Sequence, residues 1–269
     1  MLASISQHYI FRIFTFAFLA FLLYFVCSSI PTTLALYEKD QTFLILPAAV
    51  MVLSWYFVRL ERKTLHYLGL ELNLRQIKLF LSGLLIGLAA YGVVVLLVAV
   101  YANPAFQIND HLVFIPFFSG IIFLLSSAVF EELMFRGYIL KKLTESIGIV
   151  KALMVTGLLF GVYHWLAWGI LGNWQLMILS LITTGIGHLI FATALLRSGS
   201  LYLSISIHYA WNVSNEYLWF YKNDASSITP NALFILTGEQ LPQVYFTLIY
   251  IAVGLATIFA LRAFNFKKY

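Results

Sequence analysis

The chain has 269 residues, of which 62% are hydrophobic and only 10% are charged. A typical soluble domain is about 25% charged, so these few charges cannot form a solvated shell around a soluble protein of this length. The abundance of apolar residues also excludes a disordered chain. The composition therefore predicts a polytopic membrane protein, with residues 1–269 forming a single integral membrane domain.

Apolar segments long enough to cross a bilayer recur along the whole chain. A helix needs about 20 apolar residues to span the hydrocarbon core, and polar or turn residues separate the segments. The first segment lacks the basic start and cleavage site of a signal peptide, so we expect it to remain as a membrane helix. The fold expected is an all-α bundle of about eight transmembrane helices, with a surface loop over residues 221–240. The expected spans are residues 9–30, 41–58, 76–101, 112–140, 152–171, 175–196, 201–220 and 242–262.

Lys and Arg residues are unevenly divided between the two sides of these spans. If the N-terminus is cytoplasmic, thirteen of the sixteen fall on the inner side, Lys39 and Lys222 fall outside, and Arg136 lies within the membrane. This positive-inside bias predicts that both termini are cytoplasmic. We expect an integral protein of a prokaryotic plasma membrane, with the lipid bilayer as a partner. Because topology accounts for the net charge of +5, we expect no nucleic-acid partner.

Small residues predict where helices approach one another closely. Gly83 and Gly87 have the four-residue spacing of a membrane helix contact, and so do Gly157 and Gly161. We interpret both pairs as packing surfaces. Cys27 is the only cysteine, which excludes an intrachain disulfide and a metal site built from several cysteines.

Ionisable side chains inside a membrane are costly, so each one is a candidate for function. Counted at 1.5 Å per residue from the nearest inner Lys or Arg, Glu131, His164 and His208 lie roughly 15, 20 and 17 Å deep. Three separate helices thus bring a carboxylate and two imidazoles to one level, and we expect one polar site there, open to the cytoplasmic side. The polar candidates are Glu131, Glu132, Arg136, His164, His188, His208 and Asn212.

Helical spacing predicts which of these groups share a face. Glu132 and Arg136 are four residues apart and can form an ion pair, whereas Glu131 is turned about 100° away from that pair. His208 and Asn212 have the same four-residue spacing. Glu131 is therefore the carboxylate left available for chemistry.

The remaining polar groups have simpler expected roles. Phe160 precedes His164 by one turn and is expected to form an apolar wall beside it. We expect His188 to be packed or to line a cavity, and Glu216 to be solvated near the outer interface. Ser204 and Ser206 lie near His208 without a base at a fixed spacing, so a serine mechanism is disfavoured.

This inventory suits hydrolysis without a covalent intermediate. A buried carboxylate is a good general base for water, so Glu131 is expected to activate the water and His164 to hold it or to share its proton. His208 and Asn212 are expected to donate to the oxyanion that forms when water attacks an amide.

Three motifs in this region resemble those of the CAAX-processing and bacteriocin-processing (CPBP) family of intramembrane proteases, also called the Abi or type II CAAX endopeptidase-like family. Glu131 to Arg136 is similar to its EExxxR motif, Phe160 to His164 to FxxxH, and His208 to Asn212 to HxxxN. The lead-in over residues 196–201 is similar to the family's RTGSL, with Ser198 in place of threonine. The resemblance covers residues 112–220.

The resemblance implies a role for each motif residue. It implies that Glu131 activates the water with help from His164, and that His208 and Asn212 contact the tetrahedral intermediate. It also implies that Glu132 and Arg136 maintain the site. Eukaryotic members of the family cleave C-terminal tripeptides from prenylated proteins, and others resemble bacteriocin-immunity factors. We expect a peptide or membrane-associated protein as the substrate.

Two other classes of protein compete with an intramembrane endopeptidase. A secondary transporter would distribute polar groups across the full depth of the membrane, whereas here the outer halves of the spans are nearly free of charge. A non-catalytic immunity or scaffold protein of the same family is the closer alternative. It would be expected to lack a motif residue, and this chain retains all of them.

The cofactor expected is none, with zinc as the alternative. Glu131, His164 and His208 could supply the two histidines and one carboxylate of a catalytic zinc site. Against zinc, the histidines come from different helices and no acidic residue lies at helical spacing from either to accept from its second nitrogen. Asn212 is also a poor zinc ligand. We therefore favour water activated directly by Glu131.

Overall fold

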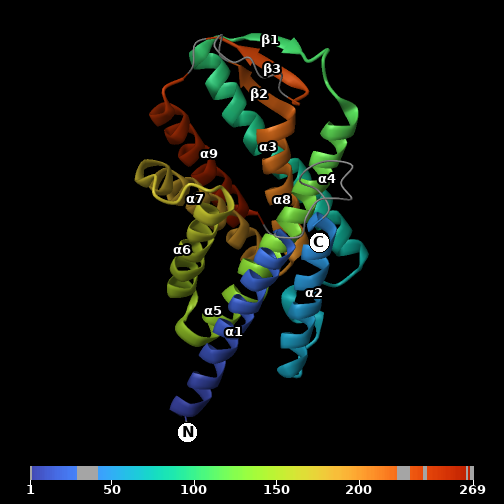
Figure 1. Cartoon of the computed structure of the whole chain (residues 1–269), viewed down its shortest axis with the longest axis vertical. Helices are drawn as coiled ribbons and strands as arrows, with labels where there is room; N and C mark the ends of the chain where they lie inside the picture. Colours follow the sequence, from blue (N-terminus) through green and yellow to red (C-terminus); the bar gives the residue numbers. More distant parts are fainter. Residues whose placement is uncertain (1, 29–41, 223–230, 239–240, 265, 267–269) are drawn as a thin grey trace.

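The computed structural model describes residues 2–28, 42–222, 231–238, 241–264 and 266. It is a bundle of long helices with a small sheet at one end (Figure 1). Some helices continue directly into π-helical turns: α4, η2 and α5 form one rod, and η3 extends α8. The helices are α1 Leu2–Ser28, α2 Thr42–Leu60, α3 Leu74–Ala102, α4 Phe114–Glu131, η2 Glu132–Ile139, α5 Leu140–Ile147, α6 Ile149–Ala167, α7 Trp174–Ser198, α8 Leu201–Val213, η3 Ser214–Leu218 and α9 Gln243–Ala263, with a short 3₁₀ turn η1 at Leu65–Leu68.

The predicted all-α membrane fold is confirmed. Each of the eight apolar segments coincides with one helical stretch, although the fourth continues to Ile147, beyond its predicted end at residue 140. Within the described residues, six of these stretches are long and apolar enough to cross a membrane, with α4, η2 and α5 counted as one. The apolar part of α2 is shorter, at Ile45–Leu60. Helix α8 is buried along most of its length and packs against α3, α4 and α7.

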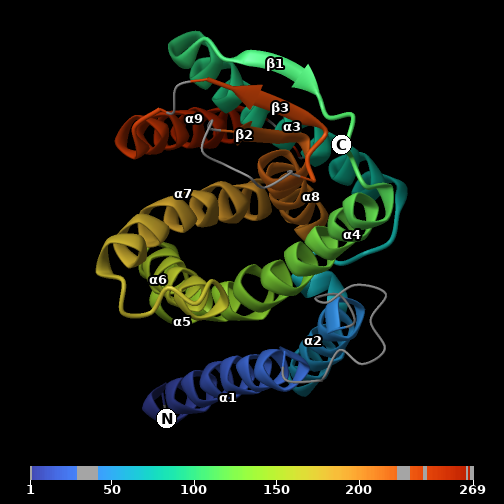
Figure 2. The same cartoon turned by 45° about the horizontal axis from the view of Figure 1, so that its top comes forward.

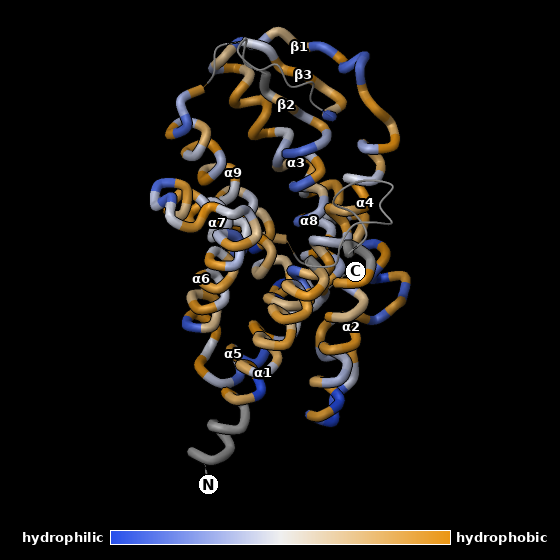
Figure 3. The backbone as a smooth tube through the Cα atoms, in the orientation of Figure 1, coloured by the Kyte–Doolittle hydropathy of each residue, from blue (hydrophilic) through white to orange (hydrophobic). Residues whose placement is uncertain are grey.

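The outer faces of the helices carry large apolar side chains. Phe11, Phe14 and Phe18 project from α1, and Leu85 and Leu96 from α3, each more than half exposed. Figure 3 shows hydrophobic residues along the helices and hydrophilic ones gathered at helix ends, such as the lower end of α2. Such a surface is unfavourable in water and is satisfied by lipid chains.

Both glycine pairs lie at close helix contacts, as predicted. A Cβ at Gly87 would lie 2.7 Å from the Ile207 carbonyl oxygen of α8, and Gly83 is as closely covered by the same helix. Gly161 and Gly157 of α6 face α7, where a Cβ at Gly161 would lie 2.3 Å from Leu181. The two pairs therefore position the helices that carry His208 and His164.

A three-stranded sheet lies at one end of the bundle (Figures 1 and 2). The central strand β3, Phe234–Thr237, pairs antiparallel with β1, Ala105–Ile108, and parallel with β2, Trp219–Lys222. The prediction of a loop over residues 221–240 is thus wrong for β3 and the end of β2, while residues 223–230 and 239–240 lie outside the described part. Backbone pairing between segments far apart in sequence forms these strands.

A buried ion network closes the opposite end. Lys142 is 2% exposed and pairs with Glu61 at 2.8 Å and with Glu145 at 2.6 Å. The Tyr138 hydroxyl donates to Glu61 over 2.6 Å, and the Tyr67 hydroxyl donates to Glu145 over 2.8 Å. Burial, followed by the bond to Glu145, raises the pKa of Tyr67. These bonds tie the end of α2 and the turn η1 to α5.

Candidate active site

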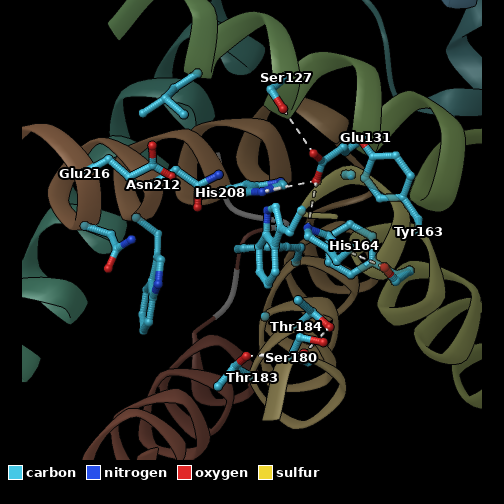
Figure 4. A pocket seen from close by; sticks show the side chains of 18 of the residues that line it. Ser127, Glu131, Tyr163, His164, Ser180, Thr183, Thr184, His208, Asn212 and Glu216 are labelled. Carbon is cyan, nitrogen blue, oxygen red and sulfur yellow. Dashed lines mark hydrogen bonds and ion pairs between the residues drawn. The ribbon is translucent and has the colours of Figure 1, made fainter. Parts of the chain in front are cut away.

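Three helices bring Glu131, His164 and His208 together, as the depth argument predicts. Oε2 of Glu131, at the end of α4, lies 3.6 Å from Nε2 of His208 on α8 and 3.9 Å from Nε2 of His164 on α6 (Figure 4). All three residues are less than one-tenth exposed. The site is therefore a buried carboxylate facing two imidazoles.

One oxygen of Glu131 is held and the other is not. The Ser127 hydroxyl, one helical turn earlier, donates to Oε1 over 3.0 Å. Oε2 is buried and has no hydrogen-bond partner among the described residues. Since a buried acceptor without a partner is costly, Oε2 is suited to receive a proton or to bind a group from outside the chain.

The Nδ1 atom of each histidine lies within hydrogen-bond distance of an acceptor oxygen. Nδ1 of His164 lies 2.7 Å from the Phe160 carbonyl oxygen, and Nδ1 of His208 lies 2.9 Å from Oε1 of Glu132. A carbonyl or carboxylate oxygen only accepts, so both Nδ1 atoms carry hydrogen. In the neutral imidazoles, Nε2 then presents a lone pair towards Glu131.

Glu132 lies beneath the site and is fully buried. The predicted pair with Arg136 is confirmed at 3.2 Å. Two contacts are added to it: the Ser204 hydroxyl donates to Oε2 over 2.5 Å, and His208 reaches Oε1. The Arg136 guanidinium also lies 3.9 Å from the centre of the Phe160 ring, a cation–π contact that favours the buried charge. Glu132 therefore connects the α4 rod to the imidazole on α8.

Two π-helical turns adjoin the site. Turn η2 begins at Glu132, directly after Glu131, and η3 begins at Ser214, two residues after Asn212. π-Helical turns are rare and concentrate at functional sites. In this chain η2 contains the first motif from Glu132 to Arg136, and η3 directly follows the last motif.

The side chains around the triad mostly lie where the spacing predicts. The Phe160 ring packs edge-on against His164, with ring centres 4.4 Å apart. Asn212 is half-buried and lies beside His208 at the cavity wall (Figure 4). His188 is buried below Phe160 and lies 3.2 Å from the Thr156 hydroxyl, which agrees with the packed role. Glu216 is exposed, but it also lines the cavity described next, a position that the sequence did not indicate.

A cavity of about 900 Å³ leads to the triad. Its deep end holds Glu131, His164 and His208, and its walls extend to Trp168 and Gln243 near the sheet end of α6 and α9. A row of hydroxyls from α7 forms one side (Figure 4). Aromatic side chains form a large part of the remaining wall. The hydroxyl row is Ser180, Thr183 and Thr184, and the aromatic residues include Tyr24, Phe123, Phe130, Tyr163, Phe191, Trp211, Phe246 and Tyr250.

The direction of this cavity corrects one prediction. The sequence predicts a site open to the Lys- and Arg-rich side, but the described lining residues lie from the triad towards the opposite, sheet-bearing end. The route to the basic end is filled by buried side chains below the triad, including Phe135, Tyr138 and Lys142. The depth of a residue along its own helix does not show which end of the bundle is filled by side chains from the other helices.

Sequence reasoning missed three residues that shape the site, and it missed the role of a fourth. Ser127 precedes Glu131 by one helical turn, a spacing that could have found it, whereas Ser204 was placed near His208 without its bond to Glu132. Phe191 of α7 stacks on the His208 ring, with centres 4.2 Å apart and planes 15° apart. Tyr163 packs edge-on against His164. These two aromatic contacts join residues whose spacing carries no signal.

The donor set also bears on metal binding. The sequence argument considered only acids at helical spacing from each histidine, and the structure adds one that it did not consider: Glu132 reaches Nδ1 of His208 from another helix. A carboxylate, two imidazoles and anchored Nδ1 atoms have the chemistry of a catalytic zinc site, so these residues fit the ion by donor type. As positioned, no three His, Cys, Asp or Glu side chains in the described part of the chain converge closely enough to hold a metal ion.

Fold and site together define a polytopic helical membrane protein with a buried glutamate–histidine centre. Residues 113–214 match the family model described as type II CAAX prenyl endopeptidase Rce1-like. This segment contains all three motifs, so the resemblance predicted from the motifs is confirmed over these residues. A comparison with curated proteins gives no significant match.

Proposed function

We propose that the protein is an intramembrane endopeptidase in which Glu131 activates water for attack on a peptide bond. One observation carries the proposal: Oε2 of Glu131, which has no hydrogen-bond partner among the described residues, faces Nε2 of both histidines at the deep end of a cavity. A general base within reach of a water, next to groups that orient that water, is the requirement for such hydrolysis. The substrate is a peptide or a segment of a membrane-associated protein.

In the first step, Oε2 of Glu131 removes a proton from the water. The water oxygen bonds to the carbonyl carbon, and the carbonyl electron pair moves onto its oxygen to give a tetrahedral oxyanion. Nε2 of His164 accepts a hydrogen bond from the second hydrogen of the water, which stays on the water oxygen, and so directs the oxygen lone pair towards the carbon. The anchored Nδ1 of His164 makes Nε2 the accepting nitrogen.

Donors from α8 stabilise the oxyanion. The Asn212 amide donates to it, and His208 donates from Nε2 when the ring is protonated, with its positive charge offset by Glu132 at Nδ1. The C–N bond then breaks, and the proton held by Glu131 passes to the leaving nitrogen. The products are a carboxyl group and an amine, and Glu131 returns to the carboxylate.

A zinc-assisted form of the same hydrolysis is the second candidate, favoured specifically by the anchored Nδ1 atoms. Glu131, His164 and His208 would hold the ion, which would supply a Lewis acid and lower the pKa of a bound water. We favour direct activation because Asn212 has a use as an oxyanion donor and a poor one as a zinc ligand.

The first test measures hydrolysis of internally quenched apolar peptides by purified protein in detergent. Glu131→Gln keeps the shape of the side chain and removes the base, so we expect a loss of at least about 100-fold in rate with no change in thermal unfolding. Asp110→Asn, on an exposed loop, is the matched control and should retain full rate. Equal rates for wild type and Glu131→Gln would contradict the proposal. Specific peptide binding with no turnover by the wild type would favour the immunity or scaffold role.

The second test separates the two forms of hydrolysis. We expect purified active protein to hold no stoichiometric metal by elemental analysis and to keep its rate after exhaustive treatment with a membrane-permeant chelator. Stoichiometric zinc, with activity lost on chelation and restored by added zinc, would assign His164 and His208 as ligands instead.

A further inference from the structure

The two histidines of the site are oriented by different parts of the molecule. His164 contacts three aromatic rings on α6 or directly after it, and its Nδ1 bonds to a carbonyl of the same helix. The centres of these rings lie 4.4 Å away for Phe160, 5.1 Å for Tyr163 and 4.6 Å for Trp168. Within the described part of the chain, the rings that contact His208 come from helices other than its own. The orientation of His208 therefore depends on how α8 packs against its neighbours.

Phe191 of α7 covers one face of the His208 imidazole. The ring centres lie 4.2 Å apart and the ring planes differ by 15°, so the two rings stack. Phe191 is 4% exposed at the edge of the cavity. Its ring also lies 5.3 Å from the Arg136 guanidinium, and its carbonyl oxygen accepts from the Ser204 hydroxyl over 2.9 Å. Ring and backbone are thus both held by groups that contact Glu132.

A hydrogen bond at Nδ1 alone does not fix the plane of an imidazole. Rotation about the Cβ–Cγ bond of histidine is a broad torsion, so a ring held by Glu132 at one nitrogen can still tilt. A tilt moves Nε2 of His208 away from Oε2 of Glu131, which lies 3.6 Å from it. A ring stacked on one face opposes this tilt, because aromatic pairs have preferred geometries.

We propose that Phe191 is a positioning residue, which holds Nε2 of His208 towards Glu131 and the reacting carbonyl by stacking on the imidazole. The proposal rests on the proposed peptidase function and adds to it a residue of α7 that lies outside the three motifs. Leucine at this position would keep the cavity wall apolar but would have no ring to stack. Tyrosine would keep the ring.

The kinetic test uses hydrolysis of internally quenched apolar peptides. We expect Phe191→Leu to lower kcat by about three- to tenfold with little change in KM, because the peptide still meets an apolar wall. Phe191→Tyr should recover most of the lost kcat. Phe16→Leu is the matched control and should keep kcat, since Phe16 is fully buried against Phe57 and does not line the cavity. If Phe191→Leu does not fold, Phe191→Met, with a flexible apolar side chain, takes its place.

Nitrogen NMR of isotope-labelled histidine gives a second readout that does not depend on activity. At alkaline pH, where imidazoles are neutral, the nitrogen shifts show which ring nitrogen carries hydrogen, and His208→Gln assigns the signal. We expect one tautomer of His208, with hydrogen on Nδ1, in the wild type, Phe191→Tyr and Phe16→Leu. In Phe191→Leu the tilted ring loosens the bond to Glu132, so both tautomers should be observed.

These measurements decide the two proposals separately. If the wild type hydrolyses peptides, an equal kcat for Phe191→Leu and Phe16→Leu, or no recovery in Phe191→Tyr, would overturn the role of Phe191 while the peptidase proposal stands. If no peptide is hydrolysed, the peptidase proposal fails and the tautomers decide the role of Phe191. Mixed tautomers in Phe191→Leu alone then support that role, and a single tautomer in every variant overturns it.

Discussion

Two adjacent carboxylates have opposite environments in this site. Glu132 is fully buried and contacts Arg136, Ser204 and His208, whereas one oxygen of Glu131 has no partner among the described residues. Consecutive helical residues point about 100° apart, so one glutamate faces the interior of the bundle and the other faces the cavity. The division of labour between stability and chemistry follows from that rotation.

Removing Arg136 should therefore affect folding more than chemistry. Arg136→Ala leaves the charge of Glu132 buried without its guanidinium partner, at a cost of about 3–5 kcal/mol. We expect a lower yield of folded protein and a lower unfolding temperature in detergent. Arg136→Lys, which keeps the charge, should recover part of both. An unfolding temperature for Arg136→Ala equal to that of Glu131→Gln would show that our division of the two glutamates is wrong.

Ser204 is predicted to position Glu132 and, through it, His208. Ser204→Ala removes one hydrogen bond to a carboxylate, worth about 1.5–3 kcal/mol, and should lower kcat by about tenfold or more with little change in KM. Ser206→Ala is the matched control, because the Ser206 hydroxyl is equally buried but donates to the Leu203 carbonyl oxygen. Equal kcat values for the two variants would contradict a positioning role for Ser204.

At the level of elements, the contact between α3 and α8 determines where His208 and Asn212 lie. The two helices approach closely because Gly83 and Gly87 have no side chain, and the backbone of α8 occupies that space. Helices in a membrane gain stability from such close packing rather than from apolar burial alone. The position of the α8 donors thus depends on residues of α3 that do not touch the site.

Gly87→Ala should separate the two helices. The added Cβ would lie 2.7 Å from the Ile207 carbonyl oxygen, and the backbone of α8 cannot easily move to relieve this clash. We therefore expect a loss of about 1–3 kcal/mol in stability and a reduced kcat. Gly92→Ala on the same helix is the matched control, since nothing lies within 4 Å of its added Cβ. At position 92, alanine is a better helix former than glycine, so the substitution should leave stability unchanged or raise it by up to about 1 kcal/mol. Similar losses in both variants would mean that helix propensity, rather than packing, is being measured.

On the scale of the whole molecule, different structures connect the helices at the two ends of the bundle. The sheet joins the ends of α3, α4, α8 and α9 on one side, and the network around Lys142 joins α2, η1 and α5 on the other. The cavity runs from the triad towards the sheet end. If the basic end is cytoplasmic, the substrate reaches the site from the outer side.

Labelling of single cysteines can establish this orientation. In a Cys27→Ala background, Asp110→Cys and Asn223→Cys should react with a membrane-impermeant maleimide added to intact cells. Ser146→Cys and Lys268→Cys should react only after permeabilisation, because the positive-inside bias places them in the cytoplasm. Labelling of Ser146→Cys in intact cells would invert the topology, and protection of Asn223→Cys would refute the last two spans as drawn.

The sequence by itself determined the features that depend on local spacing. Runs of apolar residues set the eight helical stretches. Inside a bilayer, backbone N–H groups can form hydrogen bonds only with backbone carbonyls, and a helix satisfies them within one segment. The spacing within helices predicted the pair of Glu132 with Arg136 and the wall that Phe160 forms beside His164. Depth counted along three helices predicted that Glu131, His164 and His208 meet.

Tertiary structure decided the features that join distant segments. The bond from His208 to Glu132, the stacking of Phe191 on His208 and the strand pairs of the sheet all connect residues without a periodic relation. The opening of the cavity towards the sheet end depends on which end the side chains fill, a property of the packed bundle as a whole. Spacing along one helix specifies which residues share a face, but only the packing of that face against other helices specifies what it meets.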